Sequence, residues 1–101
     1  MIKFTPGQIV YTRKTDDLVI VRFYEVIRAT SSTCELREIR KNILTQNFNE
    51  QEVEPVPSEF VSPPFRRKIS KLTGCIKMSK NLYAWPWEGD TLWQTITIFM
   101  P

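Results

Sequence analysis

The side chains that most often carry out catalysis are scarce in this chain. Its 101 residues include no histidine, which excludes Ser-His-Asp and Cys-His nucleophile systems, histidine general bases and histidine-ligated metal sites. The two cysteines, Cys34 and Cys75, lie far apart and match no zinc-ligand spacing. The glycines are isolated and form no phosphate-binding loop. We therefore expect no catalytic residues, no metal and no cofactor, and predict that the protein is not an enzyme.

A few remaining side chains keep an enzymatic alternative open. Glu25 interrupts the apolar face of the longest apolar segment. Its expected role is a rim carboxylate paired with an arginine, and a functional carboxylate is the alternative. Glu38 and an activated cysteine are the other groups on which catalysis would depend. We expect Cys34 and Cys75 to be reduced and packed in a core, with a disulfide or a reactive thiol as alternatives.

Basic and aromatic residues in the second half of the chain point to binding. The net charge of +3 is small, but no acidic residue occurs between Phe60 and Asn81. Proteins that bind single-stranded nucleic acid use cations to contact phosphates and flat rings to stack on bases. The predicted phosphate contacts come from Arg66, Arg67, Lys68, Lys71, Lys77 and Lys80, with Tyr83 or Trp85 stacking on bases.

The same half of the chain also fits a protein-interaction module. Tryptophan, tyrosine and arginine dominate interface hot spots, and all three tryptophans follow residue 84. Four glutamates between Asn49 and Glu59 directly precede the basic block. The two blocks neutralise each other, pair across a two-fold axis, or leave the basic block as a separate face. The partner in this alternative is a host protein or a second copy of the chain; neither a membrane nor a small-molecule substrate is expected.

These residues must be positioned by strands, because no helical period exceeds the background. Gln8–Lys14, Leu18–Thr30 and Thr33–Lys41 are rich in β-branched and aromatic residues and predict an antiparallel meander. The predicted fold class is mainly β, with one domain over residues 1–101. We expect a small antiparallel barrel or a strongly bent sheet of SH3-like or OB-like type, with five to seven short strands and little helix.

Two of these segments depart from a simple alternating strand. Leu18–Thr30 is about twice the usual strand length and is expected to bend or bulge so that it serves both sides of the sheet. In the third segment Ile39 falls out of phase with the apolar residues before it. A bulge near Arg37 or Glu38 would restore the register.

The rest of the chain contains shorter elements. Asn42–Asn49 predicts a loop, and the prolines at positions 55, 57, 63 and 64 argue against a central strand in the segment that follows. Helix is expected only briefly, at Pro57–Phe60. Arg66–Leu72 predicts an edge strand and Gly74–Ser79 a clearer strand. Thr95–Met100 alternates weakly and is a candidate to close the sheet.

Five short segments form an ordered set over most of the chain: Gly7–Tyr11 (GQIVY), Phe23–Val26 (FYEV), Leu36–Ile39 (LREI), Pro55–Pro57 (PVP) and Ala84–Gly89 (AWPWEG). In this set the chain resembles a group of small, largely uncharacterised proteins encoded by bacteriophages and other bacterial mobile elements. It has Leu18–Val21 where an aspartate-rich stretch is expected in that group. The resemblance implies no particular activity. It implies an accessory role and a cytoplasmic location in a bacterium or phage-infected host.

Overall fold

The computed structural model describes residues 4–95, and the regular elements within them are all β-strands. Eight antiparallel strands form one sheet in the order β6-β7-β1-β2-β3-β4-β8, and β5 pairs with β3. The strands are β1 (Ile9–Thr15), β2 (Val19–Ala29), β3 (Thr33–Gln46), β4 (Glu50–Phe60), β5 (Phe65–Lys68), β6 (Ile76–Ser79), β7 (Leu82–Pro86) and β8 (Leu92–Thr95). The prediction of five to seven short strands was too low, and three of the strands exceed ten residues.

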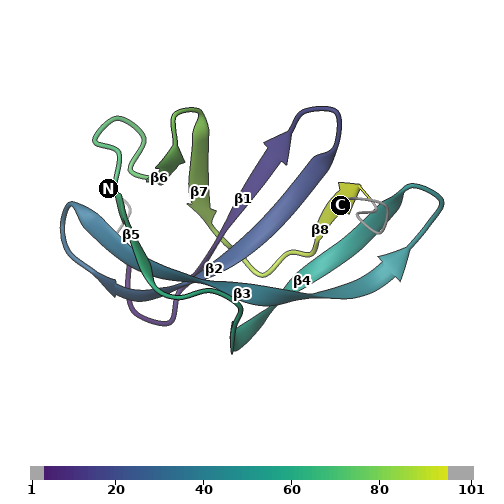
Figure 1. Ribbon diagram of the computed structural model, residues 1–101, viewed down its shortest axis with the longest axis horizontal. Coiled ribbons are helices and arrows are strands. Elements are labelled where there is room, and N and C mark those ends of the chain that lie inside the picture. The colour runs from purple at the N-terminus through teal and green to yellow at the C-terminus, as the bar shows by residue number, and fades with distance from the viewer. Residues whose placement is uncertain (1–3, 96–101) are drawn as a thin grey trace.

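Within residues 4–95 the sheet is strongly bent and does not close into a barrel. Strands β2 and β3 cross its floor, β6 and β7 stand at one end, and β8 lies beside the β3–β4 hairpin at the other (Figure 1). The molecule is accordingly elongated, with extents of 42 × 26 × 25 Å. The predicted mainly β fold class is confirmed. Residues 4–95 include no helix of the length and apolarity needed to cross a membrane.

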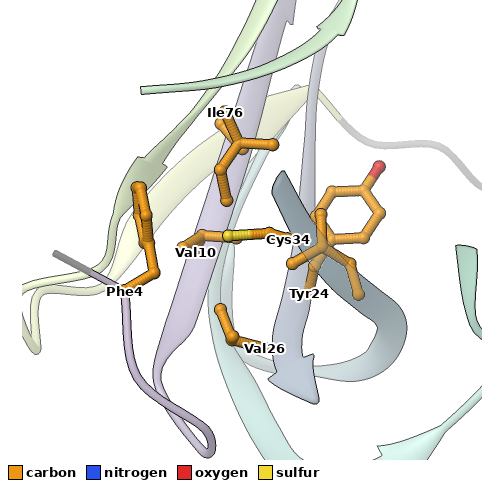
Figure 2. Packing of buried hydrophobic residues seen from close by; sticks show 8 residues of the cluster. Phe4, Val10, Tyr24, Val26, Cys34 and Ile76 are labelled. Atoms are coloured by element: carbon orange, nitrogen blue, oxygen red, sulfur yellow. The ribbon is translucent and has the colours of Figure 1, made fainter. Parts of the chain in front are cut away.

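Two hydrophobic cores on opposite faces of the sheet explain the almost unbroken apolar sequence of β2. Successive residues of a strand point to opposite faces, so Phe23 and Tyr24 enter different cores. The first core lies beneath β5, β6 and β7, and its buried residues converge from six segments (Figure 2): Phe4, Val10, Tyr24, Val26, Cys34, Leu36, Ile76 and Ala84. The second core lies toward β4 and β8 and consists of Ile9, Val21, Phe23, Ile39 and Val53.

The predicted bulge near Arg37 or Glu38 is wrong. The β2–β3 ladder is regular through both positions, and its register shift lies between Val26 and Arg28 of β2. Ile39 is out of phase because it packs in the second core, whereas the earlier apolar residues of β3 pack in the first. β3 thus contributes to both cores by turning a different face to each, and its pairing with β4 becomes irregular only from Ile39 onward.

The predicted loop at Asn42–Asn49 is mostly strand. β3 continues to Gln46, and only a short turn separates it from β4. The side-chain oxygen of Asn47 closes this turn by accepting hydrogen bonds from the backbone N–H groups of Asn49 and Glu50, at 3.1 and 2.9 Å. Both faces of this part of β3 are exposed, so the sequence lacks the alternation that normally marks a strand.

The prolines of β4 did not exclude a strand, but they lie where the strand has one free edge. Pro55 pairs with Lys41 of β3. On its other edge β4 pairs with β8 only over residues 50–53. A missing N–H is tolerated on an edge strand. The prolines therefore exclude a central strand at this position, as predicted, but they do not exclude a strand. The brief helix expected at Pro57–Phe60 is instead the end of β4.

Two of the remaining short strands, β5 and β6, lie where the sequence predicted strands. β5 occupies the start of the segment predicted as an edge strand, and β6 lies within Gly74–Ser79. Of the predicted closing segment Thr95–Met100, only Thr95 belongs to the described residues, as the last residue of β8. The other five residues lie outside them.

Side chains rather than a backbone ladder join the start of β2 to β8. Gln94 of β8 is 1% exposed, and its side-chain oxygen accepts hydrogen bonds from the backbone N–H of Val21 at 3.2 Å and from Lys41 Nζ at 2.6 Å. Lys41 Nζ also donates to the Val21 carbonyl oxygen at 2.7 Å. The side-chain NH₂ of Gln94 donates to Gln51 Oε1 at 3.1 Å. We call this contact, in which side chains join β2 and β3 to β8, the sealed seam.

Candidate nucleic-acid interface

A second pair of strands that are not joined by a ladder, β5 and β6, lie next to each other. Beyond the end of β5, a single bridge pairs Ile69 with Ile76, and the Ser70 N–H donates to the Cys75 carbonyl oxygen at 2.8 Å. No ladder joins β5 to β6 themselves. We call this the open seam. It is formed by two short edge strands that carry most of the predicted cations.

A groove of about 590 Å³, broad and open to solvent, lies over the open seam. Its cationic lining comes from both strand edges and from the turn after β6: Arg66, Arg67, Lys68, Lys77 and Lys80. Thr33 and Ser79 complete the lining, and no carboxylate of the described residues belongs to it. Folding thus brings five of the six predicted cations into one concave surface.

Arg67 crosses the open seam. It lies opposite Cys34 in the β3–β5 register, so it shares the face of the first core. Its Nε donates to the carbonyl oxygen of Met78 on β6 at 3.1 Å, and its guanidinium carbon lies 4.8 Å from the centre of the Phe65 ring. The Arg67 side chain is therefore held in place, with its charge exposed to the groove.

The acidic block does not neutralise this groove. Glu59 pairs with Arg40 at 3.6 Å, and the other glutamates of β4 lie on a strand that borders the second half of β3 and β8. Within residues 4–95, the carboxylate that pairs with a groove cation is Glu35, which lies 3.9 Å from Arg66 and 3.2 Å from Arg28. Charge is thus separated along the molecule, with cations at the β5–β6 end.

The other three predicted residues lie outside the groove lining. Lys71 is exposed in the turn between β5 and β6. Tyr83 lies opposite Lys77 in the β6–β7 register, so it is the cross-strand neighbour of one residue of the groove lining. Trp85 points to the same face of β7 two residues farther on, but it lines a different hollow with Tyr11 and Trp87.

Sequence reasoning missed Arg13 and Lys14 at the end of β1. Together with Asp16 they line a hollow of about 480 Å³. This hollow shares Ser79 and Lys80 with the groove, so further cations follow around the end of the molecule. Lys14 also lies 3.8 Å from Asp16. The pairing of β7 with β1 brings these residues beside β6, and no local pattern in the sequence signals it.

The nucleophile candidates occupy structural positions. Cys34 and Cys75 are buried free thiols, as expected of core residues. Burial raises the pKa of Cys34 to about 11. Burial also raises the pKa of Cys75, against a smaller opposing effect of its hydrogen bond with Thr73. Thiolates are the reactive form of cysteine, so both positions disfavour thiol chemistry.

The two carboxylate candidates also have partners. Within the described chain Glu25 has no arginine partner, contrary to expectation. Its Oε1 accepts hydrogen bonds from the N–H of Ser58 at 2.8 Å and from the Ser58 hydroxyl at 3.4 Å. Ser58 has a φ of 63°, which non-glycine residues rarely adopt, so Glu25 supports an unfavourable turn of β4. Glu38 pairs with Arg22 at 3.4 Å.

The arrangement as a whole presents fixed positive charge on a concave surface, which attracts anions and raises their local concentration. The cations belong to two short strands and a turn, so they match a ligand with several negative charges in a row better than a single small anion. No protein-family model matches the chain, and neither a curated protein nor a solved structure matches it.

Proposed function

We propose that this protein is a non-enzymatic module that binds single-stranded nucleic acid in the groove over the open seam. The observation that carries the proposal is the convergence of five cations on one groove that no described carboxylate lines. Phosphates bind such surfaces by displacing condensed counterions, which makes the interaction independent of base sequence. A strand that follows the groove toward Arg13 and Lys14 would meet further cations.

Single strands are favoured over duplex because an aromatic residue is the cross-strand neighbour of a groove cation. Tyr83 lies directly opposite Lys77 on the neighbouring strand, so a phosphate bound to Lys77 places a base within reach of the ring. Stacking of a base on an aromatic side chain contributes roughly 1–3 kcal/mol. We further propose that the bent sheet serves as the framework that SH3-like and OB-like barrels provide for such surfaces, in an accessory protein of a bacterial or phage-infected cytoplasm.

The test is a fluorescence anisotropy titration with a labelled oligothymidylate at several salt concentrations. Five phosphate contacts to a single strand predict a slope of about −3.5 for log K against log salt. Lys77→Gln with Lys80→Gln should make that slope shallower by about 1.4 and weaken binding at low salt. A salt-independent affinity, or no anisotropy change at micromolar protein, would refute the proposal.

A charge-matched control separates the groove from net charge. Arg22 and Arg40 are exposed cations that pair with Glu38 and Glu59, away from the groove. Arg22→Gln with Arg40→Gln removes the same formal charge and should leave the salt slope close to that of the unmodified protein. Equal losses in the two double variants would mean that the groove has no special role. Tyr83→Leu should weaken binding without changing the slope.

A further inference from the structure

A second hollow, of about 350 Å³, lies on the other side of β7 and combines three aromatic rings with two carboxylates. Trp85 and Tyr11 are directly opposite each other in the β1–β7 register. Trp87 follows on the same face, and its Nε1 donates to the Asp90 carbonyl oxygen at 2.6 Å. Glu88 and Asp90 belong to the segment between β7 and β8, which borders the rings.

The rings of this hollow differ in how firmly they are held. Trp87 packs edge-on against Phe23 of the second core, with ring centres 6.4 Å apart, and its hydrogen bond to Asp90 fixes its orientation. Trp85 is 47% exposed and forms an outer wall. The hollow therefore combines a ring of fixed orientation with an exposed ring, and two carboxylate residues belong to its lining.

The chemistry of the lining selects a cation on an apolar stem. Ring faces attract ammonium and guanidinium groups, and no lysine or arginine among residues 4–95 lines the hollow. Glu88 and Asp90 form no ion pair within that range. Pro86 and Leu92 add apolar surface for a methylene chain. A phosphate would be repelled by the same two carboxylates.

We propose that this hollow binds the lysine or arginine side chain of a partner protein. Its volume is at the lower end of the range of ligand pockets, about 300–1,000 Å³, which suits one long side chain. The two exposed carboxylates add attraction that extends to neighbouring cations of a peptide. The proposal does not depend on nucleic-acid binding, because none of the groove cations lines this hollow.

The probe is a pentapeptide, acetyl-Gly-Gly-Lys-Gly-Gly-amide, and its analogue with norleucine in place of lysine. NMR titration follows the indole N–H resonances of Trp85 and Trp87, with Trp93 as an internal reference because it lies outside the hollow. We expect the lysine peptide to shift the Trp85 and Trp87 resonances at millimolar concentration. The norleucine peptide should bind roughly tenfold more weakly, since it keeps the stem and loses the cation.

Two variants and a control complete the test. Trp85→Leu and the pair Glu88→Gln with Asp90→Asn should each weaken the lysine peptide by roughly three- to tenfold, while Trp93→Phe should not. Equal binding of the two peptides, or shifts confined to Trp93, would overturn the proposal. Self-association of the unmodified protein that is lost in the Glu88→Gln, Asp90→Asn variant would also overturn the proposal, because the hollow would then be occupied by a second copy of the chain. Oligonucleotide binding should be retained in these variants.

Discussion

The two seams of this sheet are both places where neighbouring strands form no backbone ladder, and they differ in what joins the strands. At the sealed seam a buried glutamine and a lysine supply hydrogen bonds that join β2, β3 and β8 in place of a ladder. At the open seam the backbone contacts are limited to the bridge between Ile69 and Ile76 and its neighbouring hydrogen bond. The side chain of Arg67 reaches from β5 to β6, and it lines a groove with four other cations.

The difference lies in access to water. Gln94, Val21 and Gln51 are buried, so no water can replace the hydrogen bonds of the Gln94 side chain to Val21 and Gln51. β5 and the arginines on it are exposed, so solvent can satisfy the polar groups there. A seam sealed by side chains therefore contributes mainly to stability, whereas an open one leaves charge available for a ligand. The predictions below test this division of roles.

The largest expected effect is at the sealed seam. Gln94→Leu leaves the Val21 N–H, the Lys41 ammonium and the Gln51 side chain each without one of its partners. A buried polar group left unsatisfied costs about 1–3 kcal/mol, so we expect a loss of about 3 kcal/mol in the free energy of unfolding. Urea denaturation followed by tryptophan fluorescence measures it.

Gln8→Leu is the matched control, because its side chain makes one exposed hydrogen bond, to the N–H of Thr5 at 3.1 Å. Its cost should stay within about 0.5 kcal/mol. A similar loss in the two variants would show that the buried amide has no special structural role. Folded Gln94→Leu protein should bind the oligothymidylate as the unmodified protein does, because the groove is at the opposite end of the sheet.

The second prediction concerns Cys34, which lies beneath the open seam opposite Arg67. Burial raises its pKa to about 11 from an ordinary value of 9.0. At pH 8 the thiolate fraction, and with it the rate of iodoacetamide labelling, should be about a hundredfold lower than in the unfolded chain. Peptide mapping by mass spectrometry separates Cys34 from Cys75. Rapid labelling of Cys34 in the native protein would mean that the open seam opens often enough to expose the first core.

Because the pKa of Cys34 is raised in the folded protein, its thiol should make the protein less stable as the pH rises. The folded pKa of Cys34 lies above the unfolded value, so the unfolded chain loses this proton first as the pH rises. The contribution of the thiol is complete below about pH 9 and is lost between about pH 9 and 11. Cys34→Ala should make the decline of stability over that range less steep, as judged by urea midpoints. An unchanged slope would contradict the assignment.

The sequence predicts strands well where burial alternates, and poorly where strands are held by pairing alone. β1 and β2 are identified from their apolar residues, and Cys34 and Leu36 mark the start of β3. The second half of β3 was not predicted as strand because Ile43 and Leu44 are 50% and 44% exposed, so neither face of the strand is marked by buried residues. The bulge expected in β3 assumed a single core, whereas the strand contributes to two.

The candidate groove was predictable because its cations are close together in the sequence. A stretch from Arg66 to Lys80 without acids is visible by inspection, and a tight return from β5 to β6 keeps those residues together. Arg13 joins the surface only through the pairing of β1 with β7, which depends on a contact between distant segments. Trp85 was assigned to the basic surface by proximity in sequence, yet the same β1–β7 pairing places it in the aromatic hollow.

The smallest expected effect is at the open seam and completes the comparison. Arg67→Met keeps the apolar stem over Phe65 and removes the hydrogen bond to Met78. Because the site is exposed, we expect a loss of about 1 kcal/mol in unfolding free energy, against about 0.5 kcal/mol or less for Arg66→Met. Urea denaturation measures both, and oligothymidylate affinity should fall in each. If Arg67→Met costs as much stability as Gln94→Leu, the seam between β5 and β6 is held as tightly as the sealed one, and the division of roles between them fails.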